Sequence, residues 1–200
     1  MNIPDAVRFY NLHRWRPRKE VAALLVIDMQ NYFRETAKEI IVPLAAFTNH
    51  CRENGIPVIY TAHVHKDAER DGGLLKEWWH DLIIIGTPEH AIIDEIAPHE
   101  GDPVIYKNRY SAFYETVLGE ELRNLGIRDL IIAGVMTNLC CETTARDAFV
   151  RDFRVFFLAD GTATVSPDLH LASLKNLAFG FATITTIKEL EGRLEFGMKE

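Results

Sequence analysis

The sequence predicts an α/β fold, a three-layer α/β/α sandwich around a mainly parallel six-stranded sheet. Six short segments rich in apolar and β-branched residues recur along the chain, and their polar and apolar positions do not alternate. Such continuous runs are typical of strands buried on both faces of a sheet. Helix-like segments separate the runs, so consecutive strands are joined by crossovers and lie parallel. No linker-like segment interrupts the chain, so we predict one domain over residues 1–200.

The predicted strands are short, as strands of a globular sheet usually are. They cover residues 22–28, 57–64, 103–107, 129–135, 154–160 and 182–187. Residues 66–90 form a connection that is longer than usual, which indicates either a functional lid or an irregular excursion. Residues 1–20 are predicted to be an N-terminal arm, and residues 191–200 a loosely held tail.

Three of the intervening segments carry helix signals. Apolar residues recur at helical spacing over residues 44–51, and Pro43 and Gly55 mark the expected start and end of that helix. Leucines at similar spacing over residues 118–125 predict a second helix. Ser166, followed by a proline, predicts the start of a third.

Composition and charge narrow the class of protein. The net charge of -7 and the pI near 5.6 give no electrostatic support for nucleic-acid binding. No apolar run approaches the roughly 20 residues that span a bilayer. The N-terminal residues contain no apolar signal core, and the three cysteines match no zinc or disulfide framework. We therefore predict a cytoplasmic protein without nucleic-acid or membrane partners.

Chemically active side chains follow several predicted strands. Asp28 follows the first strand and Lys107 ends the third, while the fourth runs into a polar turn that contains Cys140 and Cys141. The carboxyl ends of parallel strands meet at one edge of the sheet, where ligands bind. Taken singly, the aspartate can be a turn cap, the lysine a solvated edge residue and each cysteine core packing. Together they favour a site.

Helical phase separates the two adjacent cysteines. If a helix begins after Thr137 or Asn138, one apolar stripe faces the core. That stripe consists of Cys141, Ala145, Ala148 and Phe149. Cys140 is off this stripe, at a helix N-terminus where a thiolate is stabilised. We predict that Cys140 is the nucleophile and that Cys141 packs in the core.

Three motifs carry a resemblance to a known family. The segments "LLVIDMQNYF", "KNRYSAF" and "GVMTNLCCETTARDAF" together resemble the isochorismatase-like cysteine hydrolases, and the likeness extends over residues 22–190. The resemblance implies the three-layer hydrolase fold of that family and a catalytic triad. Carried over residue by residue, the triad is Asp28, Lys107 and Cys140.

The resemblance also implies a mechanism. Asp28 takes the thiol proton and later returns it to the leaving amine, while Lys107 balances charge and favours the thiolate. Cys140 attacks a carbonyl to form a thioester that water hydrolyses. The family's oxyanion hole corresponds to the backbone N–H groups of Met136 and Cys140, beside a cis peptide between Val135 and Met136.

Two reactions occur in this family, and the chain resembles both groups. Amidohydrolase members need the cysteine, whereas isochorismatases release pyruvate by aspartate acid catalysis without it. The segments "RWRPRKEVAALLVIDMQNYF" and "DLHLASLKNLA" look like the isochorismatase subgroup. Cys140 is present, however, and His63 and Gly72 stand where that subgroup has Gln and Arg. We therefore predict hydrolysis of a C–N bond (amide, carbamoyl or ureido) of a small-molecule substrate, with isochorismate cleavage as the alternative.

The pattern "HVH" raises the question of a metal. Nicotinamidase-type members bind a metal through an Asp-x-His pair and a later histidine, but here His63 replaces the Asp, and His80 and His90 are only candidates for a third ligand. The alternative is that His63 or His65 lines the pocket and contacts substrate. We predict no metal and no cofactor. The predicted substrate-binding residues are Phe33, His63, Tyr110 and Thr137. The resemblance further implies a homodimer or homotetramer.

Overall fold

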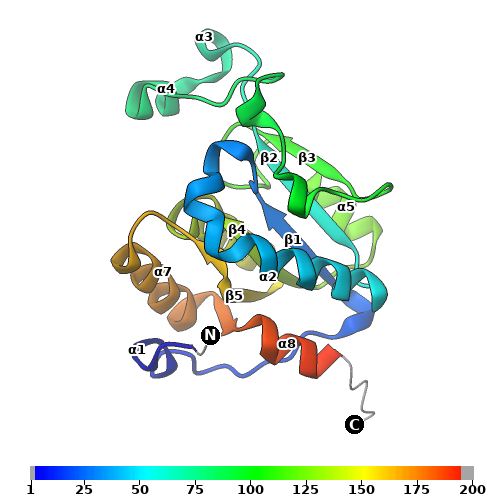
Figure 1. Ribbon diagram of the computed structural model, residues 1–200. Helices are drawn as coiled ribbons and strands as arrows, with labels where there is room; N and C mark the ends of the chain where they lie inside the picture. The colour runs from blue at the N-terminus through cyan, green and yellow to red at the C-terminus, as the bar shows by residue number, and fades with distance from the viewer. Residues whose placement is uncertain (1–2, 195–200) are drawn as a thin grey trace.

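The computed structural model describes residues 3–194 and is built on a six-stranded, fully parallel sheet (Figure 1). The strands are β1 (Ala22–Ile27), β2 (Val58–His63), β3 (Val104–Lys107), β4 (Asp129–Val135), β5 (Arg154–Ala163) and β6 (Ala182–Thr185). Their order across the sheet is β3-β2-β1-β4-β5-β6. The predicted fold class is confirmed, and β5 extends beyond its predicted end at residue 160 to Ala163.

Helices and short helical turns connect the strands. The α-helices are α1 (Asp5–Arg8), α2 (Arg34–Glu53), α3 (Ala68–Asp71), α4 (Gly73–Trp79), α5 (Leu118–Asn124), α6 (Glu142–Val150), α7 (Pro167–Gly180) and α8 (Ile187–Leu194). The 3-10 turns are η1 (Lys19–Val21), η2 (Asn31–Phe33), η3 (Pro88–His90) and η4 (Asp94–Ile96), and η5 (Thr137–Cys141) is a π-helical turn.

Each face of the sheet carries its own apolar core. Helices α2 and α8 cover one face (Figure 1), while α1, α5, α6 and α7 contribute to the core on the other. In β1, Leu24 and Val26 face α2, whereas Leu25 and Ile27 face the opposite layer, and all four are fully buried. Burying such a side chain stabilises the fold by about 1.5–3 kcal/mol. This two-sided burial explains why the strands read as unbroken apolar runs.

Two sequence expectations about helices are wrong. Helix α2 begins at Arg34, so Pro43 lies inside the helix rather than before it. The buried stripe of α2 already includes Ala37 and Ile40, and this packing holds the helix through a position that lacks a backbone N–H. Phe149 is 40% exposed rather than part of the α6 core stripe, and its ring packs edge-on against Phe181.

The chain ends also differ in part from the expectation. In the arm, Val7 is buried and the Asn11 amide hydrogen-bonds both the N–H and the carbonyl of Ile184 at the sheet edge. Residues 191–194 of the predicted tail belong to α8, whereas residues 195–200 lie outside the described part of the chain. Within residues 3–194, no helix has the length and apolar character needed to cross a membrane.

The strand order fixes where a ligand binds. From β1 the chain proceeds outward through β2 to β3, and from β4 it proceeds outward on the other side through β5 to β6. The connections after β1 and β4 therefore diverge and leave a crevice at the carboxyl ends of these two strands. Figure 1 shows α3 and α4 beyond the end of the sheet, where the long connection of residues 66–90 returns through a bridge between Ile84 and His65.

Candidate active site

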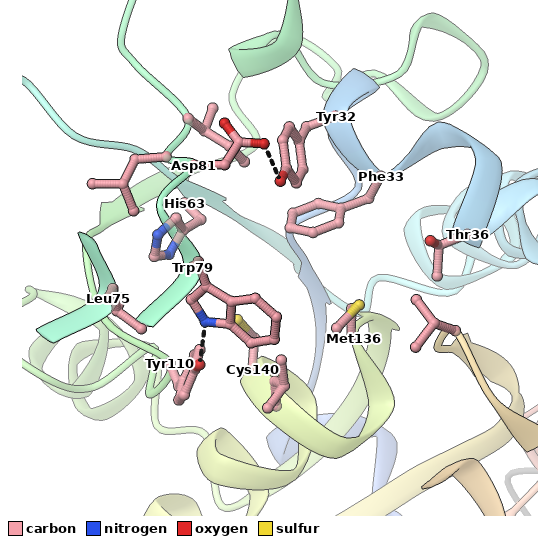
Figure 2. A pocket seen from close by; sticks show the side chains of 14 residues that line it. Tyr32, Phe33, Thr36, His63, Leu75, Trp79, Asp81, Tyr110, Met136 and Cys140 are labelled. Carbon is pink, nitrogen blue, oxygen red and sulfur yellow. Dashed lines mark hydrogen bonds between the residues drawn. The ribbon is translucent and has the colours of Figure 1, made fainter. Parts of the chain in front are cut away.

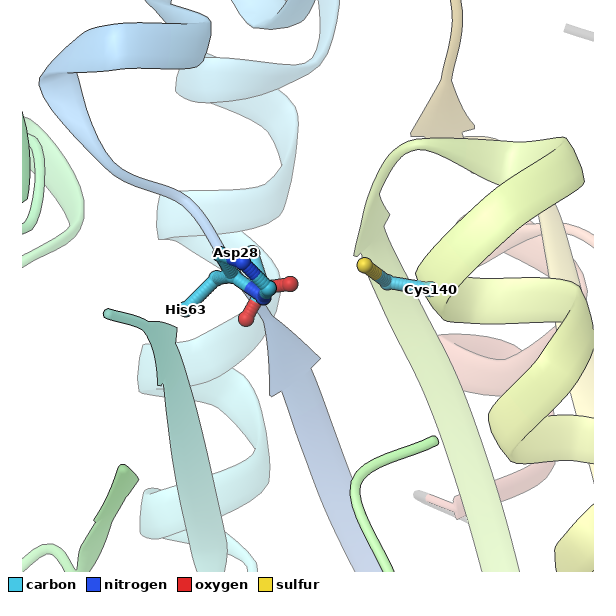
Figure 3. Close-up of side chains that lie close together, drawn as sticks. All are labelled: Asp28, His63 and Cys140. Carbon is cyan, nitrogen blue, oxygen red and sulfur yellow. The ribbon is translucent and has the colours of Figure 1, made fainter. Parts of the chain in front are cut away.

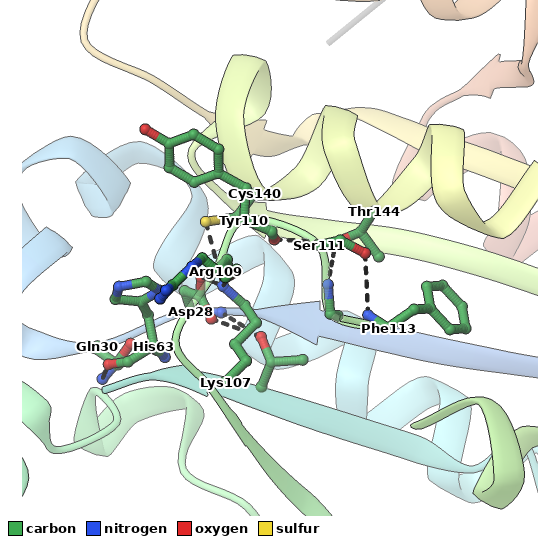
Figure 4. A network of polar contacts seen from close by, with 12 residues as sticks. Asp28, Gln30, His63, Lys107, Arg109, Tyr110, Ser111, Phe113, Cys140 and Thr144 are labelled. Atoms are coloured by element: carbon green, nitrogen blue, oxygen red, sulfur yellow. Dashed lines mark hydrogen bonds and ion pairs between the residues drawn. The ribbon is translucent and has the colours of Figure 1, made fainter. Parts of the chain in front are cut away.

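Asp28, Lys107 and Cys140 meet at the carboxyl edge of the sheet (Figure 4). Asp28 directly follows β1, and Cys140 lies in η5 directly after β4. Lys107 ends β3, and its side chain reaches past β2 so that Nζ lies 2.6 Å from Asp28 Oδ2. The same ammonium donates hydrogen bonds to Cys140 Sγ at 3.3 Å and to the Arg109 carbonyl at 3.1 Å. One ammonium group thus contacts a carboxylate, a thiol and a backbone carbonyl.

The backbone around Asp28 is shaped to hold the carboxylate in place. Asp28 has a φ of 50°, in the left-handed region, where the chain turns sharply out of β1. Thr61 in β2 donates its hydroxyl to Asp28 Oδ1 at 2.6 Å. On the other side of β1, Gly134 has a φ of 115°, and a Cβ there would overlap the carbonyl oxygen of Ile27. Glycine therefore permits the close approach of β4 to β1 beneath the site.

Burial decides the protonation of the nucleophile candidate. It raises the pKa of the Cys140 thiol to about 12, and the opposing effect of Lys107 is smaller. Burial alone would lower the pKa of Lys107, but Asp28 and Cys140 outweigh it and raise that pKa above its ordinary value. The resting site therefore holds a neutral thiol beside an Asp28–Lys107 ion pair. Lys107 lowers the pKa of the Cys140 thiol, as expected from the sequence, but by less than burial raises it.

The two adjacent cysteines have different surroundings. Cys140 is 6% exposed and lines a cavity, whereas Cys141 is fully buried with Ala145 and Ala148 in the core. Burial also raises the pKa of Cys141 well above its ordinary value. The predicted helix start is a π turn, η5, but the order of the two side chains around it is the one that the helical phase predicts.

A cavity of about 350 Å³ opens beside Cys140 (Figure 2). Its walls are mostly apolar and aromatic. The lining residues are Tyr32, Phe33, Thr36, His63, Leu75, Trp79, Asp81, Leu82, Ile83, Tyr110, Met136, Leu139, Cys140 and Val165. At this cavity, two hydrogen bonds join the long connection of residues 66–90, here called the excursion, to the rest of the protein. Trp79 Nε1 donates to the Tyr110 hydroxyl at 2.8 Å, and the Tyr32 hydroxyl donates to Asp81 at 2.9 Å. None of these lining residues is a lysine or an arginine.

Comparison with known proteins decides the family. The isochorismatase domain model matches residues 22–189, which is most of the chain. The chain belongs to the isochorismatase family.

Relatives of this isochorismatase-family protein include hydrolases of more than one kind. Nicotinamidase 3 of Arabidopsis thaliana is 46% identical over 193 residues, covering 95% of this chain and 97% of that protein. Isochorismatase of Bacillus subtilis (strain 168) is 37% identical over 171 residues, covering 82% of this chain and 55% of that protein. A crystal structure of a cysteine hydrolase from Pseudomonas syringae pv. phaseolicola 1448A has a TM-score of 0.88 at 28% identity, covering 98% of this chain and 99% of that one. These findings confirm that the protein is a hydrolase.

The predicted substrate-binding residues of this family member fall into two groups. Phe33, His63 and Tyr110 line the cavity. Thr137 lies outside the cavity lining: it is fully buried, and its hydroxyl is hydrogen-bonded to His170 Nδ1 at 2.9 Å. His170 in turn approaches the Ala159 carbonyl with Nε2 at 3.1 Å, so the Thr137 hydroxyl serves the packing of α7 against the sheet.

The predicted oxyanion-hole residues lie at the same wall. Met136 and Cys140 both line the cavity, and the peptide between Val135 and Met136 is cis, as the resemblance implies. The N–H groups of Leu139 and Cys141 donate to the Met136 carbonyl at 3.1 and 3.2 Å. These two N–H groups are therefore already hydrogen-bonded at η5.

The candidate metal ligands of this isochorismatase-family site do not fit a metal ion. One ligand atom each of Asp28, His63 and Cys140 lies within 4.8 Å of the others (Figure 3). Lys107, however, already places its positive charge against Asp28 and Cys140, so a cation there meets an ammonium ion. Both ring nitrogens of His65 are also engaged, one with His63 and one with Asp71. No catalytic step is therefore assigned to a metal.

Sequence reasoning missed one partner of the site. It noted the paired histidines of "HVH", but not that Asp71, in the excursion, lies 3.1 Å from His65 Nδ1. Nothing in the spacing of Asp71 marks it, because it ends the short helix α3 and only the irregular path of this connection brings it back to β2.

Proposed function

We propose that the protein hydrolyses the C–N bond of a small, uncharged aromatic amide of the nicotinamide class, with Cys140 as the nucleophile. One observation carries the proposal: the Cys140 thiol faces an apolar cavity while Lys107 and Asp28 lie directly behind it. A thiol with an adjacent base and an adjacent cation has the parts that covalent amide hydrolysis needs. The 46% identity to a nicotinamidase supports this substrate class.

The proposed reaction begins with a proton transfer. A thiol whose pKa is about 12 is not ionised near neutral pH, so Asp28 removes its proton as Sγ attacks the carbonyl carbon. A C–S bond forms and the carbonyl electrons move to oxygen. When the intermediate collapses, the C–N bond breaks and Asp28 returns the proton to the departing nitrogen. Water, activated by Asp28, then hydrolyses the thioester and restores the thiol.

The proposed oxyanion hole consists of the Met136 and Cys140 backbone N–H groups. The neighbouring N–H groups of Leu139 and Cys141 are bonded to the Met136 carbonyl, which supports this choice. A donor in this role is worth about 2.7–4 kcal/mol in the transition state. Throughout the reaction, Lys107 keeps the Asp28 carboxylate oriented toward the sulfur.

The lining of the cavity supports an uncharged substrate. Burying a carboxylate without a cationic partner is costly, and no lysine or arginine is among the described residues that line the cavity. A dicarboxylate such as isochorismate therefore has no charge partner there. The 37% identity to an isochorismatase keeps pyruvate release from isochorismate as a second candidate to be assayed.

The test is a substrate panel combined with a matched pair of cysteine variants. We expect ammonia release from nicotinamide and related aromatic amides and no pyruvate release from isochorismate. Cys140→Ala removes the nucleophile and should lower amide turnover by about 10⁴-fold or more while the protein stays folded. Cys141→Ala makes the same change one residue away and should keep turnover while lowering the melting temperature. Amide turnover that survives in Cys140→Ala contradicts the proposal.

A further inference from the structure

Two buried histidines and a partly buried aspartate connect the long connection of residues 66–90 to the cavity. His63 Nε2 lies 3.1 Å from His65 Nε2, and His65 Nδ1 lies 3.1 Å from Asp71 Oδ1. His65 is fully buried and His63 is 7% exposed. Arg109 donates to the Asp71 carbonyl at 2.8 Å and so fixes the backbone of α3 at this point. We call Asp71, His65 and His63 the histidine relay.

The direction of each hydrogen bond in the relay follows from Asp71. Partial burial alone would raise the pKa of Asp71, but hydrogen bonds from the Lys66 N–H and the His65 ring lower it below its ordinary value. An ionised carboxylate only accepts, so His65 Nδ1 carries a proton and donates it to Asp71. His65 is fully buried, which disfavours a charged ring, and a neutral ring with its proton on Nδ1 has a lone pair on Nε2. That lone pair accepts from His63 Nε2–H.

His63 Nδ1 is consequently a bare acceptor. Burial, followed by the charge of Lys107, lowers the pKa of His63 to about 3, so the ring stays neutral. Nδ1 is buried and has no hydrogen-bond partner in the described structure, while the ring lines the cavity beside Cys140 (Figure 2). A buried polar atom without a partner carries a free-energy cost of about 1–3 kcal/mol. A ligand that donates to it recovers that cost.

We propose that the histidine relay holds His63 Nδ1 as a fixed acceptor for one N–H of a primary carboxamide, with His65 and Asp71 as positioning residues. This inference rests on the proposed amide hydrolysis. A ring nitrogen of His63 and a carboxylate oxygen of Asp28 lie within 4.8 Å of each other (Figure 3). An amide nitrogen bound to His63 through one N–H is thus held where Asp28 protonates it on departure. His63 accepts a hydrogen bond only; the transferred proton travels from Cys140 to Asp28 to the nitrogen.

The Asp71→Asn variant should reverse the direction of the hydrogen bonds in the histidine relay. The Lys66 N–H donates to Asp71 Oδ2 at 2.8 Å, so the single oxygen of the new amide is retained there and its NH₂ faces His65 Nδ1. His65 Nδ1 must then accept, its Nε2–H donates to His63 Nε2, and His63 Nδ1 acquires the proton. An N–H in place of a lone pair now opposes the N–H of the substrate amide.

The first measurement is the protonation state of the His63 ring nitrogens, read from ¹⁵N–¹H correlation NMR of the full-length protein. We expect Nδ1 to be unprotonated in the wild type and protonated in Asp71→Asn. Asp67→Asn is the matched control: it makes the same change in the same segment, and asparagine still caps α3 through the Glu69 N–H. A protonated Nδ1 in the wild type overturns the relay without any variant, as does an unchanged pattern in a folded Asp71→Asn.

The second measurement is substrate selectivity. Asp71→Asn should lower the ratio of kcat/KM for a primary aromatic amide to that for the corresponding methyl ester, which has no N–H, by about tenfold. Asp67→Asn should leave the ratio unchanged. Equal losses for amide and ester overturn the positioning role. Absence of amide turnover in the wild type, with Nδ1 unprotonated, overturns the proposed function and leaves the hydrogen-bond directions standing.

Discussion

Two fully buried aspartates at opposite ends of the sheet have different surroundings. Asp129, at the start of β4, accepts from Arg154 Nε at 2.8 Å and Nη2 at 2.6 Å, and from the Arg18 N–H at 2.7 Å. Both of its oxygens are saturated by strong donors. Asp28 has one oxygen on Thr61 and the other against Lys107, an ammonium that it shares with a thiol.

The difference supports the catalytic role that we propose for Asp28, because burial alone does not distinguish the two carboxylates. The Arg154 side chain is 32% exposed, so the ion pair of Asp129 reaches solvent and stabilises the sheet edge. Asp28 Oδ2 contacts Lys107 but has no hydrogen bond of good geometry, so it keeps acceptor capacity beside a proton donor. The partners of Asp129 therefore fit a structural role, and those of Asp28 fit the chemical role that we propose for it.

Among the changes that test this comparison, exchanging each aspartate for asparagine should have the largest effect. Asp28→Asn should lower kcat/KM for the amide by about 10²–10⁴-fold, because the amide side chain neither accepts nor returns the proton. Asp129→Asn should retain kcat/KM and lose about 1–3 kcal/mol of unfolding free energy through weaker bonds to Arg154. Activity assays well below the melting temperature and denaturant titrations measure the two effects. If Asp129→Asn loses as much activity as Asp28→Asn, the separation of roles is wrong.

A smaller effect concerns the reactivity of the thiol. Since burial raises the pKa of Cys140 to about 12, iodoacetamide should label it slowly at neutral pH. The rate should keep rising about tenfold per pH unit past pH 9, where an ordinary thiol levels off. Lys107→Met should slow labelling further at each pH, because it removes the cation that lowers the thiol pKa. A rate that levels off below pH 8 would show that the resting site holds a thiolate.

The smallest effect is expected at the rim of the cavity. Tyr110→Phe removes the acceptor of the Trp79 Nε1–H hydrogen bond and should raise KM about two- to tenfold, with kcat little changed. Tyr114, which is 48% exposed, supplies the control through Tyr114→Phe. Steady-state kinetics of both variants separates the contributions. A fall in kcat of Tyr110→Phe with KM unchanged would place the tyrosine in the chemical step instead.

The sequence predicts the sheet and the meeting of Asp28, Lys107 and Cys140 because both depend on local pattern. Apolar runs mark the buried strands, and parallel strands deliver their carboxyl ends to one edge. It also separates Cys140 from Cys141, since the positions of successive side chains follow helical phase even in a π turn.

Other features depend on tertiary contacts that no local pattern records. Pro43 lies inside α2 because the buried face of the helix extends back to Ala37. The hydroxyl of Thr137 is hydrogen-bonded to His170 in α7, a helix that follows the next strand of the chain, β5. The high pKa of Cys140 arises from burial, which overrides the lysine that sequence reasoning expected to prevail.

The most direct test of the account is to capture the acyl-enzyme. The protein is mixed with an excess of an aromatic amide or its slowly hydrolysed analogue, quenched in acid, digested and mapped by mass spectrometry. We predict a mass increase equal to the acyl group on Cys140, absent from Cys140→Ala and unchanged in Cys141→Ala. Amide turnover without an adduct on Cys140, or an adduct on Cys141, would contradict covalent catalysis by Cys140.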